Sequence, residues 1–110
     1  MVRLLVSYLL GLDCVLSSSI ATIKTAGNTA FPLHCDGPSE DRSRPLGAAA
    51  MFALSDFDGA AGGATAFLPA SHRSGRTPGD ITDPSELPGV EAVSTPVGSL
   101  LVWSEKTWHG

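Results

Sequence analysis

The sequence predicts a mainly β fold, a sandwich or barrel, preceded by one helix. Short runs of apolar or β-branched residues are separated by turns that contain Gly and Pro, which is typical of such folds. Hydrophobic residues make up 43% of the 110 residues, which favours a globular chain over a disordered one. Because no repeat or long linker divides the sequence, we expect one domain over 1–110, with a helical lead-in at 1–19 and core strands and loops at 20–110.

The first expected element is a helix over residues 2–10 that ends near Gly11. Arg3 and the leucine-rich run after it also resemble a secretory signal peptide. Against that alternative, Gly11 interrupts the apolar stretch and Asp13 adds a charge. The apolar run at 4–10 is much shorter than the roughly 20 residues that a membrane-spanning helix needs. We therefore interpret this segment as a helix packed on the core, and we expect no membrane span.

Six strands are expected along the rest of the chain. The segment 20–25 is rich in β-branched residues, and the length of the apolar run at 47–54 favours a strand over a helix. Polar loops with Gly and Pro are expected at 37–46 and 69–88, and Pro96-Val97-Gly98 indicates a turn. The expected strands cover residues 20–25, 31–36 (a short strand or the end of one), 47–54, 65–68, 90–93 and 99–104.

Charge and cysteine content restrict the class of protein. The formal net charge is −4, and the few Lys and Arg residues form no cluster in the sequence larger than two. This argues against a nucleic-acid partner, because phosphate binding needs a concentrated basic face. Two cysteines, Cys14 and Cys35, are too few for a disulfide framework. We interpret them as reduced thiols of a cytoplasmic protein.

The stretch FPLHCDG at 31–37 holds the first candidate site residues. On an extended chain, His34 and Asp36 project to one face and Cys35 to the other. A third candidate ligand, His109, follows the apolar run at 100–103. Two histidines and one carboxylate on one side of an ion are the ligand set of non-haem Fe(II) oxygenases. A His-x-Asp doublet alone is a weak signal, so a surface or core histidine at 34 and a frayed end at 109 stay open alternatives.

Three motifs together resemble the phytanoyl-CoA dioxygenase family of Fe(II)/2-oxoglutarate oxygenases. Residues 32–36 match its plHxD motif, and residues 53–72 match its aLdD, nGat and vPGSH block. Residues 96–110 match its closing pGsllvw and wHg motifs. The motifs follow one another in the family order and span roughly 20–110 of the chain.

The resemblance implies a double-stranded β-helix, that is, a cupin-like jelly roll, which is incomplete here. It implies that His34, Asp36 and His109 bind Fe(II), with 2-oxoglutarate and dioxygen as co-substrates. The implied reaction hydroxylates a small organic substrate and releases succinate and carbon dioxide. Halogenating relatives replace the carboxylate by a small residue, so Asp36 favours hydroxylation. His72, in the PGSH-like turn, is not a family iron ligand, and we assign it a loop position or a supporting role beside the ligands.

The sequence departs from the family pattern at three points. Ala70 stands at the Gly of PGSH, which would alter the turn if a positive φ is required there. Gly62 replaces an Asn. The family also places a basic residue about ten positions after the distal histidine to hold the far carboxylate of 2-oxoglutarate, whereas this sequence ends at Gly110. We therefore expect a fragment of a longer reading frame or a truncated member. The nearest basic residues, none at the family position, are Arg73, Arg76 and Lys106.

Two other classes of function stay open. One is a non-catalytic metal-binding jelly-roll module, or an inactive fragment, which would fit the missing basic residue. The other is a zinc-dependent hydrolase that uses the same three ligands and a metal-bound water. A hydrolase would need a general base near the metal, and the sequence offers no convincing one. The family acts on acyl thioesters, compatible solutes and natural-product scaffolds, and the sequence does not choose among them.

Overall fold

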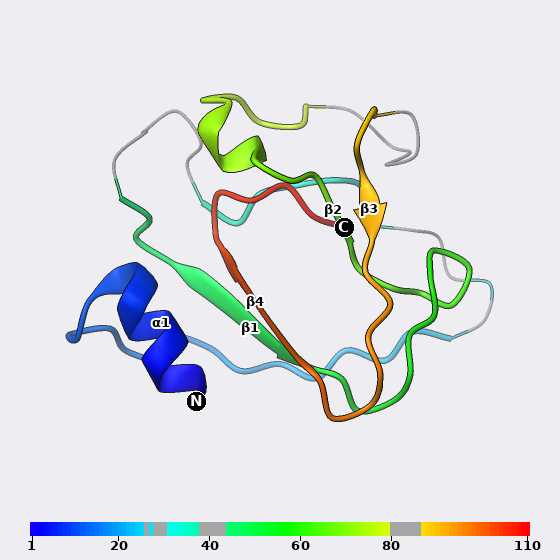
Figure 1. The fold of residues 1–110 in the computed structure, drawn as a ribbon, viewed down its shortest axis with the longest axis horizontal. Helices are drawn as coiled ribbons and strands as arrows, with labels where there is room; N and C mark the ends of the chain where they lie inside the picture. The colour runs from blue at the N-terminus through cyan, green and yellow to red at the C-terminus, as the bar shows by residue number, and fades with distance from the viewer. Residues whose placement is uncertain (26, 28–30, 38–43, 80–86) are drawn as a thin grey trace.

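The computed structural model describes residues 1–25, 27, 31–37, 44–79 and 87–110. Helix α1 (Val2–Leu10) comes first, and two small antiparallel sheets follow (Figure 1). Strand β1 (Ala48–Phe52) pairs with β4 (Leu100–Ser104), and β2 (Ala66–Phe67) pairs with β3 (Glu91–Ala92). The 3₁₀ turn η1 (Ser71–Arg73) lies after β2. The expected mainly β character is confirmed, whereas the described residues form two separate two-stranded sheets and do not show a closed jelly roll.

The β1–β4 pair carries the longer ladder of the two sheets. Ala49 lies opposite Trp103, and Met51 lies opposite Leu101. A small residue opposite a large one leaves room for the tryptophan ring on that face. The predicted turn at 96–98 is confirmed and leads into β4. Its Gly98 has φ 83°, a left-handed conformation that suits glycine.

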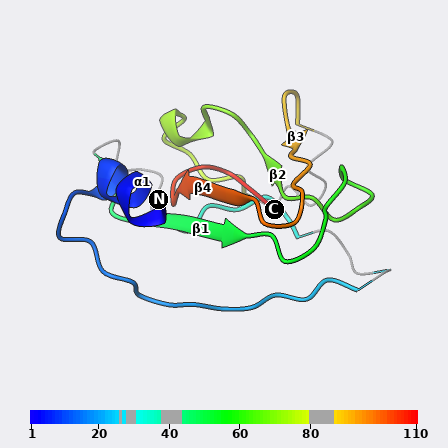
Figure 2. The ribbon, with the colours of Figure 1, turned by 60° about the horizontal axis from the view of Figure 1, so that its bottom comes forward.

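The strand expected at 20–25 is wrong. Residues 20–25 have no strand partner among the described residues, and they run as an extended strap along one side of the molecule (Figure 2). A β-branched run favours extended backbone, but a strand also needs a hydrogen-bonded neighbour. The short strand or strand end expected at 31–36 is present only as one isolated bridge at His34. The other predicted strands are present and shorter than expected, and parts of the predicted loops at 37–46 and 69–88 lie outside the described residues.

Helix α1 confirms the expected helix, and it ends where Gly11 donates its N–H to the Ser7 carbonyl at 2.9 Å. The helix lies against β1 and β4, yet none of its residues is fully buried, so the expected burial on a core is only partial. The described part of the chain contains no helix with the length and apolar character needed to cross a membrane. The buried apolar side chains of the described residues are Leu33, Ala53, Ala64 and Trp108.

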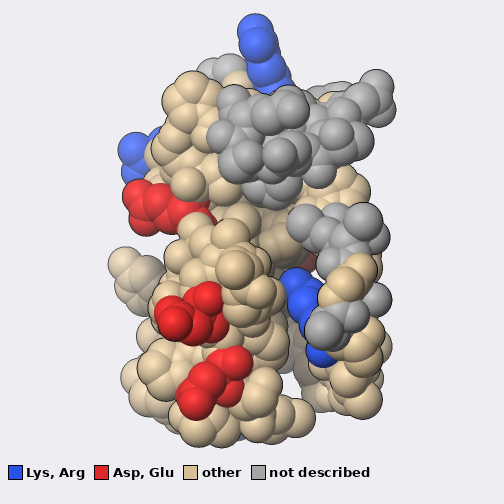
Figure 3. Space-filling view, turned by 90° about the vertical axis from the view of Figure 1, so that its right-hand side faces the viewer, with Lys and Arg blue, Asp and Glu red and all other residues tan. Residues whose placement is uncertain are grey.

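Charged side chains are dispersed over the face drawn in Figure 3. Acidic and basic groups are scattered there among mostly uncharged atoms. This agrees with a chain in which only 16% of residues are charged. Of the buried residues, Leu33, Trp108 and His109 belong to the segments that meet at His109, where the candidate ligands lie.

Candidate metal centre

Three segments far apart in the sequence meet at His109. The N–H of His34 donates to the His109 carbonyl, and the N–H of His109 donates back to the His34 carbonyl, both at 2.9 Å. On the other edge, Ala66 and Gly110 exchange hydrogen bonds of 2.9 and 3.0 Å in the same way. Residues 108–110 therefore lie between two neighbours, like a short central strand, and His109 is held from both sides.

Backbone contacts to Glu105 hold Asp36. The N–H of Asp36 donates to the Glu105 carbonyl at 2.8 Å, and the N–H of Gly37 donates to the same oxygen at 3.2 Å. A Cβ atom at Gly37 would lie 2.5 Å from Cδ of Glu105, so any larger residue would displace that side chain. The Glu105 carboxylate in turn accepts the Leu46 N–H at 2.8 Å. The glycine of FPLHCDG is thus explained by the close approach of Glu105.

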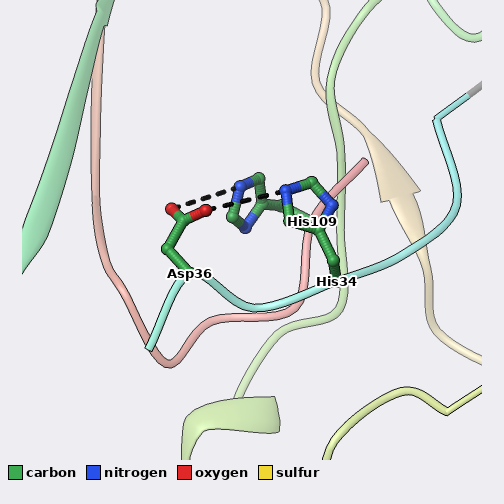
Figure 4. A group of neighbouring side chains, drawn as sticks. All are labelled: His34, Asp36 and His109. Atoms are coloured by element: carbon green, nitrogen blue, oxygen red, sulfur yellow. Dashed lines mark ion pairs between the residues drawn. The ribbon is translucent and has the colours of Figure 1, made fainter. Parts of the chain in front are cut away.

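The three predicted ligands come together in space, as Figure 4 shows. One oxygen of Asp36 lies 3.6 Å from Nε2 of His34, and its other oxygen lies 3.6 Å from Nε2 of His109. The centroids of the two imidazole rings are 4.4 Å apart. One potential ligand atom from each residue lies within 4.8 Å of the other two. The assignment of these three residues as metal ligands stays a prediction.

The hydrogen bonds at Nδ1 indicate which nitrogen of each ring could bind a metal. Nδ1 of His34 lies 3.1 Å from the Pro32 carbonyl, and Nδ1 of His109 lies 2.8 Å from the Thr107 carbonyl. A carbonyl oxygen only accepts, so each neutral ring carries its proton on Nδ1 and a lone pair on Nε2. Two lone pairs and a carboxylate then face one another beyond hydrogen-bond distance. This donor set fits a shared cation, and the backbone carbonyls supply the outer support that metal-binding histidines usually have.

The site has one buried wall and one open side. His109 is 6% exposed, whereas the side chains of His34 and Asp36 are each 45% exposed. The Trp103 and Phe67 rings cover His109, with centroids 5.0 and 6.0 Å from its ring. Burial lowers the pKa of His109, and the Thr107 hydrogen bond and the charge of Asp36 oppose that shift only in part. The lowered pKa favours the neutral ring, which is the form that binds metals.

Cys35 is not a member of this group, although it lies between two of its residues. Burial first, and the negative charge of Asp36 second, raise the pKa of the Cys35 thiol. The thiol therefore stays protonated at neutral pH, whereas a metal ligand would be the thiolate.

His72 is not a member either. It lies in η1, its side chain is exposed, and it faces a cavity described below. Ala70, just before η1, has φ 63° and ψ 3°. The turn thus takes the left-handed conformation for which glycine is suited, with an alanine in the position.

Sequence reasoning missed two contributors to the site. The hydroxyl of Ser71 accepts the Trp108 N–H at 2.8 Å, and this fixes the residue before His109. The buried indole N–H of Trp103 has no hydrogen-bond partner among the described residues, although its ring packs against His109. The serine could have been suspected from the PGSH-like motif. A strand tryptophan is ordinarily read as core, so no signal singled out Trp103.

Comparison with known protein families decides the membership. The model of the family described as Phytanoyl-CoA dioxygenase (PhyH) matches residues 2–110. The chain belongs to the phytanoyl-CoA dioxygenase family. The resemblance inferred from the motifs is thereby confirmed over nearly the whole chain, and it points to enzymes of the dioxygenase type. No solved structure was found to match this phytanoyl-CoA dioxygenase family member.

Proposed function

We propose that this family member is an Fe(II)/2-oxoglutarate-dependent dioxygenase that hydroxylates a small organic substrate. The observation that carries the proposal is the convergence of two Nε2 lone pairs and one carboxylate in the group of His34, Asp36 and His109. Membership of the phytanoyl-CoA dioxygenase family supports the same chemistry.

In this proposal His34 and His109 hold Fe(II) through Nε2, and Asp36 holds it through its carboxylate. When bound, Fe(II) supplies the activation of dioxygen that couples oxidation of 2-oxoglutarate to hydroxylation of the substrate. Two neutral rings and one carboxylate leave a divalent ion with a net positive charge. The ligand set therefore attracts an anionic co-substrate such as 2-oxoglutarate.

The residues around the ligands orient them and exclude water. The carbonyls of Pro32 and Thr107 hold the two rings in the Nδ1–H form. The Trp103 and Phe67 rings shield His109 from solvent on its buried side. The open side, at His34 and Asp36, is where a substrate and dioxygen would enter.

We extend the proposal to the domain and its location. We infer that 1–110 is part of one jelly-roll oxygenase domain, in which 1–19 lead in and 20–110 carry core strands and loops. The pairing of 108–110 with segments on both edges supports the assignment of 20–110 to the core of the domain. Cys14 and Cys35 are free thiols, which supports the cytoplasm as the location.

An anaerobic titration with Fe(II) and 2-oxoglutarate tests the function. We expect the weak visible charge-transfer band of the metal-bound co-substrate with the unmodified chain. Asp36→Ala should abolish the band, because it removes the only carboxylate of the group. His72→Ala is the matched control, since it removes a histidine that lies outside the group, and the band should persist.

Two outcomes would contradict the proposal. If Fe(II) binds to the three residues and no band forms with 2-oxoglutarate, the chain is a metal-binding module. If zinc is retained through purification and no oxygen-dependent turnover follows on loading with Fe(II), a zinc hydrolase becomes the better reading.

A further inference from the structure

The structure contains a cavity that is lined by basic residues and lies apart from the candidate metal centre. It lies where the end of α1, the end of β4 and η1 come together, and its volume is about 640 Å³. This size is in the range of small-molecule sites, which is about 300–1,000 Å³. The described residues that line it are Leu9, Pro45, His72, Arg73, Ser104, Lys106 and Thr107.

The described lining is basic. Arg73 and Lys106 carry full positive charges and His72 a titratable ring, whereas no acidic side chain is among the described lining residues. Lys106 is only 4% exposed, so its ammonium group has little access to bulk water. Its buried charge needs oxygen partners. Lys106 already interacts with other groups of the protein, and its ammonium group carries three N–H donors.

The cavity is separate from the candidate metal centre. None of the three candidate ligands lines it, and neither do the two rings that cover His109. Trp103 packs against His109, and the next residue of β4, Ser104, lines the cavity. Successive strand residues point to opposite faces, which accounts for the separation. Thr107 touches both regions, since it lines the cavity and its carbonyl accepts the Nδ1–H of the His109 ring.

We propose that this cavity binds a small phosphate monoester. Arg73 and Lys106 together match the charge of a phosphate dianion, and charge-assisted hydrogen bonds from both groups are the strong kind. The hydroxyls of Ser104 and Thr107 add neutral donors. Leu9 and Pro45 give the cavity an apolar wall, which fits the organic part of an ester better than it fits free phosphate.

Calorimetric titration with phenyl phosphate and with inorganic phosphate, without added metal, tests this inference. We expect phenyl phosphate to bind more tightly than inorganic phosphate. Arg73→Gln and Lys106→Gln should each weaken phenyl phosphate binding by about tenfold, the loss typical of one hydrogen bond to a charged group. Because Lys106 is buried, its variant must first show an unchanged circular dichroism spectrum; should it fail to fold, the exposed Arg73 decides the result.

Two controls separate the site from general charge attraction and from the metal centre. Arg76→Gln removes the same charge near η1 from a residue outside the described lining, and it should leave the affinity unchanged. Asp36→Ala should also leave it unchanged, so this proposal can fail independently of the oxygenase proposal. The inference is overturned if phenyl phosphate does not bind, if Arg76→Gln weakens binding as much as Arg73→Gln, or if Asp36→Ala changes it.

Discussion

Residues 12–25 and residues 100–110 are both rich in apolar or β-branched side chains, but the two segments differ in pairing and in burial. The first segment includes the extended strap at 20–25. The large apolar side chains of the segment stay more than 80% exposed: Leu12, Val15, Leu16, Ile20 and Ile23. The second segment forms β4 and then the paired end at 108–110, where Trp108 and His109 are buried.

Apolar or β-branched composition alone does not make a strand. Residues 100–104 find β1, and residues 108–110 find neighbours on both edges, so their N–H and C=O groups are paired. The strap is not paired as a strand with any described segment. Extended backbone is favoured locally in both segments. Only the segment that finds a hydrogen-bonded neighbour forms strand structure, and that segment carries a candidate ligand.

The largest expected effect concerns the metal. His109→Ala should weaken Fe(II) binding by at least about 100-fold, because loss of a ligand should cost no less than loss of an outer-shell partner. Equilibrium competition with a chelator of known affinity measures this change. An unchanged affinity would show that the paired end at 108–110 is ordered without serving the metal. His72→Ala serves as the control, and we expect it to bind Fe(II) like the unmodified chain.

A second prediction compares the strap with the core directly. Leu33→Ala should lower the free energy of unfolding by about 3 kcal/mol, because Leu33 is 2% exposed and its loss leaves a cavity. Ile20→Ala, in the strap, should change it by less than about 0.5 kcal/mol. Urea unfolding of both variants measures the difference. Equal losses would mean that the strap packs in solution, and the comparison between the two segments would then fail.

A smaller gain is expected at the turn that supports Trp108. Ala70→Gly should raise the free energy of unfolding by about 0.5–1 kcal/mol, because glycine adopts φ 63° without the strain of a Cβ atom, and part of this gain is lost to greater freedom in the unfolded chain. Ala61→Gly is the matched control, since Ala61 lies in an exposed turn at negative φ. Urea unfolding should show stabilisation at position 70 alone, and stabilisation at both positions would remove the strain argument.

The smallest expected effect is on pH dependence of the metal-free chain. The pKa of His109 is lowered in the folded state, chiefly by burial, from the value near 6.5 typical of unfolded histidine. The unfolded state therefore takes up the proton first. The stability that the neutral ring contributes is complete above about pH 6.5 and is lost as the pH falls towards the folded pKa. His109→Gln should remove this part of the slope, and identical slopes for both proteins would contradict the assignment.

Several local elements and the chemistry of the candidate ligands could be predicted from the amino-acid sequence. The helix at 2–10 with its end at Gly11, the turn at 96–98, the strand at 99–104 and the family motifs are all readable, because each depends on neighbours in the chain. The plHxD and wHg motifs named His34, Asp36 and His109 as candidates, although the sequence does not show that they come within reach of one another.

Features that depend on residues distant in the chain emerge only in the three-dimensional structure. It left 20–25 without a strand, reduced 31–36 to a single bridge, and buried Lys106 beside a basic cavity. It also placed Glu105 against Gly37, the Ser71 hydroxyl under Trp108, and the indole of Trp103 on His109. The physical reason is the same in each case: pairing, burial and convergence of donor atoms join residues that are far apart in the chain, and local preference carries no information about which of them will meet.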